Sequence, residues 1–163
     1  MQLFISSVSN LTDARFFSAY GISYFGFCFD VLDPNAVTID QVKEISGWLH
    51  EPRIIGQFGD HQTWEEMLYI KEQLPLHAVL VSNQHPDKSR ISLPKWIQTA
   101  SGIIHPTDSG IFVSADWTKE LLQQILPINP YGIHIACTKE ERPGISKTEY
   151  YAELMEILEP YWT

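Results

Sequence analysis

The sequence predicts an α/β protein built as a shortened (β/α)8 barrel of the TIM type. Short apolar stretches alternate with helical patterns along much of the chain, which is the rhythm of parallel strands joined by helices. Up to eight strands can be assigned, and eight strands with short returns favour a closed barrel over an open sheet. The chain has 163 residues, fewer than the roughly 200 of a complete barrel. Some outer helices should therefore be missing or reduced.

The first half of the chain contains four strands and three helices in alternation. Asn10 caps the first helix and Gly21 ends it, while the segments Thr38–Gln41 and Thr63–Glu66 are capping boxes that begin the other two. The strands between them are short, bulky and apolar. The predicted strands are 3–6, 23–29, 53–58 and 77–82, and the predicted helices are 10–20, 38–49 and 63–73.

The second half breaks this alternation. The segment Asn83–Pro94 has two prolines and no helical period, so the helices after strands four, five and six are predicted to be missing or reduced. Asp116 is expected to cap a helix over 117–126. Ser146–Glu149 is a third capping box, and its helix is expected to end near Leu158. The remaining strands are expected within 94–101, 102–110, 110–115 and 131–136.

Composition and charge limit the classes of function. Hydrophobic residues make up 44% and charged residues 19% of the chain, as in an ordinary globular protein, and no linker or repeat divides residues 1–163 into more than one domain. The net charge of −9 argues against nucleic acid or an anionic membrane as a partner. No apolar run reaches the ~18 residues of a membrane span. With no signal-peptide pattern and two cysteines outside any metal-type spacing, we expect a cytoplasmic protein with no metal and no cofactor.

Two sections of the chain resemble one family of barrel enzymes. Phe4–Ala14 reads FISSVSNLTDA and lies without a gap over a family opening that contains the strand KICG. Phe112–Lys147 matches the closing section at Pro130-Tyr131-Gly132, Glu140 and Pro143-Gly144-Ile145. These features resemble phosphoribosylanthranilate isomerase, the (β/α)8 barrel of tryptophan biosynthesis. The resemblance covers about two-thirds of the chain, and residues 84–110 do not align.

The resemblance implies the positions of the catalytic groups. The family's general base, the cysteine of KICG, falls on Ser6, and the glycine after it falls on Ser7. The arginine that faces the anthranilate carboxylate falls on Asn35. The general acid is an aspartate that ends strand six, for which the best local match is His105, with Asp108 nearby.

The resemblance also implies the positions that bind the substrate phosphate. The family's glycine pair after strand seven falls on Ser114 and Ala115. Its SSG motif after strand eight falls on Ala136, Cys137 and Thr138, and the aspartate before that motif falls on His134. Glycine lets a backbone approach a phosphate closely, so side chains at these positions should weaken phosphate binding.

These replacements predict that the isomerase reaction is lost. The reaction needs an acid to open the ribose ring and a base to remove a proton from C2′. A serine hydroxyl is far less acidic than a thiol and needs a neighbouring base such as His134 or His105, whose proximity to Ser6 the sequence does not establish. Three functions remain open: a barrel that binds a small phosphorylated metabolite or a protein partner without the ancestral reaction, an isomerase with an atypical base, and a structural or interaction protein.

The missing helices predict a homo-oligomer. Both faces of a parallel sheet are normally buried, so strands without outer helices need another cover. A second copy of the chain, most simply in a dimer, would provide it. The residues expected on this uncovered side are Ile91, Leu93, Trp96, Ile97, Ile103 and Ile104.

Overall fold

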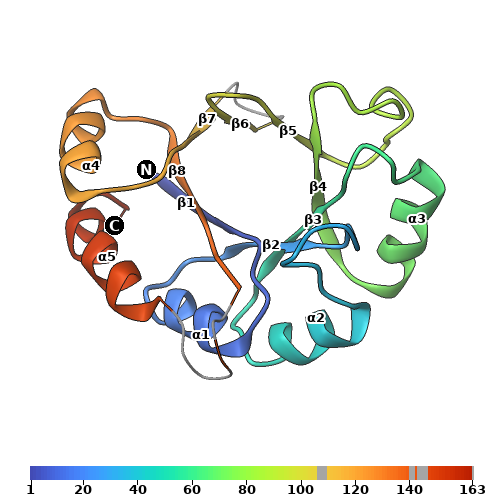
Figure 1. Ribbon diagram of the computed structural model, residues 1–163, viewed down its shortest axis with the longest axis horizontal. Coiled ribbons are helices and arrows are strands. Elements are labelled where there is room, and N and C mark those ends of the chain that lie inside the picture. The colour runs from blue at the N-terminus through green and yellow to red at the C-terminus, as the bar shows by residue number, and fades with distance from the viewer. Residues whose placement is uncertain (106–109, 140–141, 143–146, 163) are drawn as a thin grey trace.

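Eight strands close into a barrel in the computed structural model, and they follow one another around it in chain order (Figure 1). The structure describes residues 1–105, 110–139, 142 and 147–162. The closed barrel that the sequence predicts is therefore confirmed. The strands are β1 (Gln2–Ser6), β2 (Tyr24–Cys28), β3 (Arg53–Gln57), β4 (Leu76–Ser82), β5 (Lys95–Gln98), β6 (Gly102–Ile104), β7 (Ile111–Ser114) and β8 (Gly132–Ala136).

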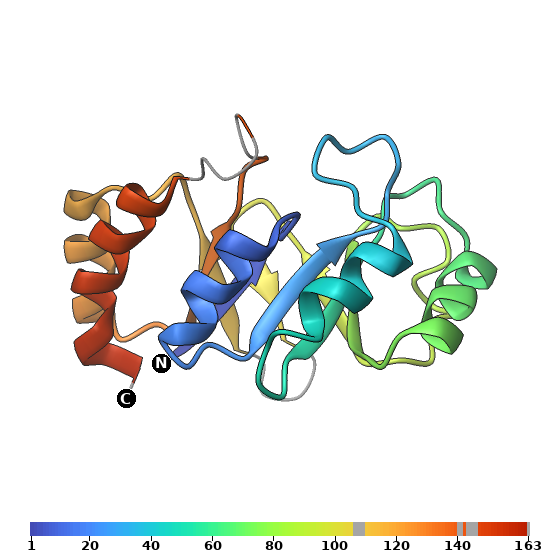
Figure 2. The same cartoon turned by 90° about the horizontal axis from the view of Figure 1, so that it is seen from below.

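Helices of the described part follow only five of the strands. Figure 2 shows α4 and α5 on one flank of the barrel, α3 on the other, and α1 and α2 between them. None of these helices is long and apolar enough to cross a membrane, a finding that holds for the described residues. The helices are α1 (Leu11–Ala19), α2 (Ile39–Ser46), α3 (Trp64–Gln73), α4 (Lys119–Ile125) with the 3-10 turn η1 (Leu126–Ile128), and α5 (Thr148–Trp162).

The helix caps follow the sequence with two exceptions. Asn10 caps α1, and Thr38 and Thr63 form reciprocal capping boxes at α2 and α3. The cap of α4 is Thr118 and not Asp116, because the Thr118 side chain accepts a hydrogen bond from the backbone N–H of Leu121. The last helix runs to Trp162, four residues beyond the expected end, and Ser146 of the expected capping box lies outside the described residues.

The strand β6 runs antiparallel to both of its neighbours, whereas the sequence pattern predicts a parallel sheet. Only residues 99–101 join β5 to β6, and the turn is closed by a 2.8 Å hydrogen bond from Thr99 N–H to the Gly102 carbonyl. A parallel return needs a crossover of about a dozen residues or more, so a link this short forces a hairpin. The carboxyl end of β6 therefore lies at one end of the barrel, and the carboxyl ends of β5 and β7 lie at the other.

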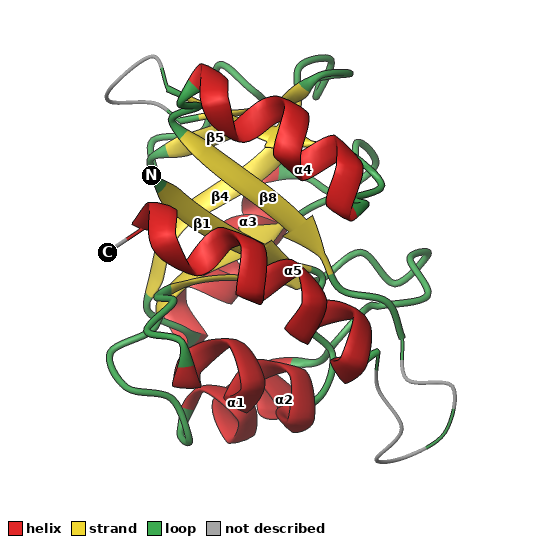
Figure 3. Cartoon of the chain, turned by 90° about the vertical axis from the view of Figure 1, so that its left-hand side faces the viewer, coloured by secondary structure: helices red, strands yellow, loops and turns green. Residues whose placement is uncertain are grey.

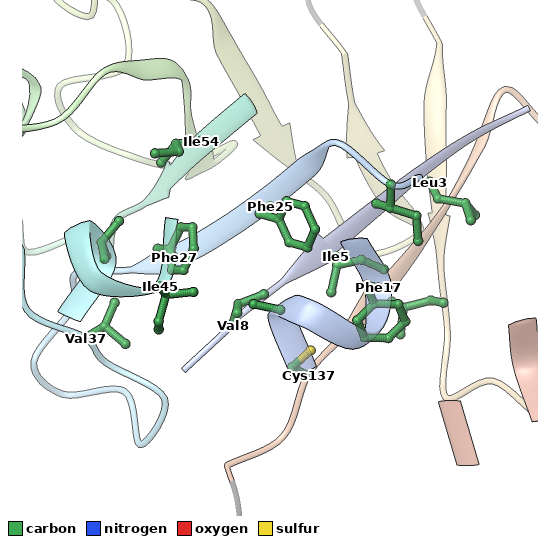
Figure 4. Close-up of a cluster of buried hydrophobic side chains, with 14 of the residues drawn as sticks. Leu3, Ile5, Val8, Phe17, Phe25, Phe27, Val37, Ile45, Ile54 and Cys137 are labelled. Atoms are coloured by element: carbon green, nitrogen blue, oxygen red, sulfur yellow. The ribbon is translucent and has the colours of Figure 1, made fainter. Parts of the chain in front are cut away.

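Side chains alternate between the inside of the barrel and the layer beneath the helices. A buried cluster fills the barrel, and it includes Phe4, Tyr24, Ile55, Trp96, Ile103 and Phe112. A second cluster lies between the strands and the helices, as the close-up of β1, β2 and α1 shows (Figure 4). The expectation that Trp96 and Ile103 lie on the outer side is wrong: both point inward and are fully buried, because inward and outward residues alternate along a strand.

The outer side of β5, β6 and β7 nevertheless carries exposed apolar side chains. Ile97 of β5 pairs with Ile104 of β6, and Ile104 pairs with Ile111 of β7, so three isoleucines lie side by side across the strands. Ile104 is 36% exposed and Ile111 42% exposed. Ile91, expected here, is instead buried in the core cluster between the strands and the helices. The prediction of an uncovered apolar side is thus confirmed for Ile104, while Ile97 is half-buried.

Candidate functional site

Three side chains from β1, β7 and β8 form a hydrogen-bonded chain inside the barrel. Phe4 and Ser6 both point inward because they are two residues apart on β1. The parallel register places His134 of β8 beside Phe4 and opposite Ser114 of β7. Ser6 Oγ lies 2.6 Å from His134 Nε2, and Ser114 Oγ lies 2.7 Å from His134 Nδ1. The structure therefore brings Ser6 and His134 together, which the sequence left open.

The environment of this chain holds His134 neutral. Its imidazole stacks on the Phe4 ring with a centroid separation of 5.2 Å, and burial lowers the pKa of His134 to about 4. A neutral imidazole donates from one nitrogen and accepts at the other, so it can bond to both hydroxyl groups at once. Ser6 is only 2% exposed. Such an arrangement fixes the three strand ends firmly, and it offers a base much weaker than an ordinary histidine.

A glutamine that the sequence analysis missed completes this end of β1. The backbone N–H of Ser7 donates to Gln57 Oε1 at 2.7 Å, and Ser7 adopts a left-handed conformation with φ of 55°. Gly26 leaves the space for this amide, because a Cβ there would lie 2.6 Å from Gln57 Oε1. The signal was present in the sequence: Gln57 follows Ile55 by two residues and therefore points inward, as a polar group in an apolar strand.

The structure does not bring His105 together with Ser6. Because β6 is antiparallel, His105 lies near the start of β7 and the start of β8, at the other end of the barrel. Its ring centroid is 5.1 Å from that of Trp96 and 5.8 Å from that of Tyr131, the residue just before β8. An acid at His105 would not face the same ligand as Ser6. Asp108 lies outside the described residues.

Three of the five positions expected to bind phosphate line a cavity of about 330 Å³ beside the carboxyl ends of β7 and β8, whereas Ser114 points into the barrel toward His134. Figure 3 shows α4 and α5 flanking β8 on this side of the barrel. Ala115 and Thr138 line the cavity, and Lys147 supplies a cation. The other lining residues are Asp116, Trp117, Thr118, Ile135, Ala136, Tyr150 and Tyr151.

Cys137 has a different place. Its side chain is buried in the layer between the barrel and the helices, close to α1 (Figure 4). Burial raises the pKa of the Cys137 thiol well above its ordinary value, with a further contribution from Asp13. The thiol therefore stays protonated and points away from the cavity. Only the backbone of Cys137 is available to a ligand there, and its N–H already donates to the Ser6 carbonyl at 2.9 Å.

The other half of the barrel mouth is acidic. A cavity of about 310 Å³ above β2, β3 and β4 is lined by Asp30, Asp33 and Asp60 together with Gln57 and Gln98. Burial tends to raise the pKa of Asp30, but hydrogen bonds from the Leu32 N–H and from His61 outweigh it and leave that pKa below its ordinary value. The Asp30 carboxylate is therefore charged at neutral pH.

Asn35 stands beside this acidic group. Its backbone N–H donates to Asp33 Oδ1 at 2.7 Å, and its own Oδ1 is buried without a hydrogen-bond partner among the described residues. A neutral amide next to carboxylates would not attract a substrate carboxylate, whereas an arginine would. Within the described residues, no group of three or more His, Cys, Asp or Glu side chains is arranged to hold a metal ion.

Comparison with known proteins finds the same barrel in one group of enzymes. No protein-family model matches the sequence, and no curated protein matches it. The structure is similar to phosphoribosyl anthranilate isomerase from Thermus thermophilus, with a TM-score of 0.75 and 19% identity over 97% of this chain and 98% of that one.

Two further structures show the same likeness. Monomers of the dimeric enzyme from Thermotoga maritima give a TM-score of 0.69 at 18% identity, covering 96% of this chain and 97% of that one. An isomerase in complex with reduced 1-(o-carboxyphenylamino)-1-deoxyribulose 5-phosphate gives 0.70 at 17%, covering 99% and 97%. At such low identities the comparison establishes a shared fold over nearly the whole chain.

Proposed function

We propose that this chain is a phosphoribosylanthranilate isomerase-like barrel that has lost the isomerase reaction and binds a small phosphorylated metabolite at its mouth. The observation that carries the proposal is the state of Ser6. At the position of the family's base, this chain has a buried hydroxyl that is hydrogen-bonded to a neutral histidine. Proton removal from carbon needs a base whose pKa is matched to the task, and neither group meets this requirement.

The acidic half of the mouth supports the loss of the original substrate. Phosphoribosylanthranilate carries a carboxylate and a phosphate, so it is strongly anionic. The half of the mouth that would receive its carboxylate has Asn35 in place of an arginine, next to Asp30 and Asp33. The negative charges of the protein carboxylates repel the substrate carboxylate and disfavour its binding.

The cavity beside β7 and β8 supports binding of a phosphorylated ligand. Barrels commonly hold phosphate on the loops after these two strands. Here the cavity retains Lys147 and the Thr138 hydroxyl as donors. The solved isomerase complex with a deoxyribulose 5-phosphate contains a ligand of this chemical class.

A working isomerase is the second candidate, and the 2.6 Å contact between Ser6 Oγ and His134 Nε2 favours it. A serine paired with a histidine is an arrangement that can be activated by proton transfer. Under this candidate, His134 takes the Ser6 proton while the substrate is bound. A purely structural or interaction protein is the third candidate. A mouth that binds a protein partner in place of the metabolite is a variant of the first candidate.

Turnover of phosphoribosylanthranilate by the wild-type chain is expected to be undetectable, at least about 10³-fold below that of an active isomerase, because acid, base and carboxylate partner are all replaced. Loss of substrate fluorescence at high protein concentration measures it. The variant Ser6→Cys should be inactive too, since the acid and Asn35 positions remain unsuitable. Turnover that disappears in Ser6→Ala but persists in Ser7→Ala would instead establish the second candidate.

Ligand binding needs a separate measurement. Ribose 5-phosphate is expected to raise the melting temperature of the wild-type chain, while ribose should not. Lys147→Gln should abolish the shift because it removes the cation from the cavity. If ribose 5-phosphate leaves the melting temperature unchanged at millimolar concentration, the barrel does not bind such metabolites and the third candidate is favoured.

We further propose that the chain forms a homodimer through the outer side of β6 and β7, where Ile104 and Ile111 are exposed. Ile104→Asp is expected to yield monomers in light scattering at micromolar concentration, because a charge on an apolar interface must be desolvated. Ile128→Asp is the matched control: Ile128 is 75% exposed on η1 and is not part of these strands, so its replacement should leave the mass unchanged. A monomeric wild-type chain would contradict this proposal.

A further inference from the structure

A further hollow of the surface lies on the outer side of the barrel. It is a groove of about 600 Å³ between β5 and the segment that connects β4 to β5, where no outer helix is present. Figure 1 shows this connection as a long loop beyond β4. Its volume falls within the range of small-molecule sites, roughly 300–1,000 Å³. The groove is lined by Asn83, Lys88, Ser89, Ile91, Ser92, Leu93, Pro94, Lys95 and Ile97.

The floor of the groove is aliphatic. Ile91 is buried in the core, and Leu93 and Ile97 are half-buried against it. Pro94 adds a further apolar surface between them. Among the described residues no aromatic ring lines the groove, so these residues offer no face on which a planar ligand could stack. The shape and chemistry of the floor suit a flexible hydrocarbon chain.

Two ammonium groups are held at the groove by uncharged oxygen atoms. Lys88 Nζ donates to the Asn83 carbonyl at 2.7 Å and to Asn83 Oδ1 at 2.9 Å. Lys95 Nζ donates to the Lys88 carbonyl at 2.9 Å. An ammonium group has three donors, so these contacts leave capacity on each lysine.

The positive charge of this pair is unusual in its setting. The ion pairs found among the described residues involve His61, Arg90 and Lys119 but neither Lys88 nor Lys95. The whole chain carries 20 acidic residues against 11 lysine and arginine residues. Two lysines without a carboxylate partner, at the edge of an aliphatic floor, are complementary to a ligand with an anionic head and an apolar tail.

We propose that the groove binds a medium-chain aliphatic carboxylate, with its tail along Leu93 and Ile97 and its carboxylate at the ammonium groups of Lys88 and Lys95. This site is separate from the barrel mouth and does not depend on the function proposed there. Burial of the tail supplies the affinity, and the charge-assisted hydrogen bonds supply the preference for an anion.

Displacement of 8-anilinonaphthalene-1-sulfonate by decanoate, followed by fluorescence on the folded full-length chain, tests the proposal. Decanoate should displace the dye at least about 10-fold more effectively than decanol, which has the same tail without the charge. Lys95→Gln should weaken decanoate binding about 10-fold, and Leu93→Asp should abolish it. Lys43→Gln removes an exposed lysine of α2 and should change nothing.

Several outcomes would overturn the proposal. Equal displacement by decanol and decanoate, or an undiminished decanoate affinity in Lys95→Gln, would show that the lysines select no anion. Decanoate binding that appears only in the Ile104→Asp variant would make a second copy of the chain the natural occupant of the groove. The response to ribose 5-phosphate is measured in parallel, so a failure at the groove is distinguished from a failure at the barrel mouth.

Discussion

Replacement of Trp96 by alanine is expected to destabilise the barrel by about 3–5 kcal/mol. Trp96 is fully buried at the centre of the barrel and contacts the rings of Phe4, Tyr24 and Phe112 at centroid separations of 4.9, 5.2 and 5.1 Å. These neighbours come from β1, β2 and β7, so they are held by separate strands and cannot close over the space that the indole leaves. This loss is a large fraction of the roughly 5–15 kcal/mol that stabilises a typical domain.

Urea unfolding followed by far-ultraviolet circular dichroism, at one fixed protein concentration, measures the effect. Trp48→Ala is the control, because Trp48 is 65% exposed and its recorded ring contact is with Arg15 at 5.9 Å. That variant should change the free energy of unfolding by less than about 1 kcal/mol. A loss below about 1 kcal/mol in Trp96→Ala would mean that the barrel interior is not packed around this ring.

The sequence could predict the strands and most helices because their signals are local. Capping boxes at Thr38 and Thr63 need only residues three positions apart, and the structure contains both. No helix lies between β4 and β7 among the described residues, and this could be predicted in the same way, from the prolines and the lost period after Ser82. Closure of the sheet into a barrel could also be predicted, because eight strands with short returns favour that architecture.

The direction of β6 could not be predicted from the same signals, and the error reached the site. A three-residue strand carries too little pattern to show which way it runs. Its direction depends on the short link at 99–101, and a parallel assumption placed His105 at the barrel mouth. The structure places it near Tyr131, at the opposite end. The outward assignment of Trp96 failed for a different reason: Trp96 and Ile97 are neighbours on β5, and neighbouring residues of a strand point to opposite faces.

Contacts across the barrel could not be predicted from the sequence either. Ser6 and His134 are 128 residues apart, and only the register of β1 with β8 brings them to 2.6 Å. Gln57 reaches Ser7 for the same kind of reason, from β3 to the end of β1 past the space left by Gly26. The sequence could name Ser6 as a changed position, but the replacement network around it depends on tertiary structure.

The network around His134 leads to a prediction about acid stability. Burial lowers the pKa of His134 to about 4 in the folded chain, while an exposed histidine in the unfolded chain has a pKa near 6.5. The unfolded chain therefore binds more protons between these two values, and stability rises with pH in this window. As the pH falls from about 6.5 to about 4, His134 alone should cost about 2–3 kcal/mol of stability, and the loss should level off about one pH unit below that.

Comparison with the variant His134→Gln isolates this contribution. Glutamine can bond to both Ser6 and Ser114 but does not titrate, so the other acid-sensitive groups, Asp30 and His77 among them, remain common to both chains. Urea unfolding at pH 7 and at pH 4 should show a loss about 2–3 kcal/mol smaller in the variant. Equal losses would mean that His134 has an ordinary pKa in the folded chain. The imidazole would then be able to act as a base at neutral pH, which would favour the working isomerase over the barrel that has lost its reaction.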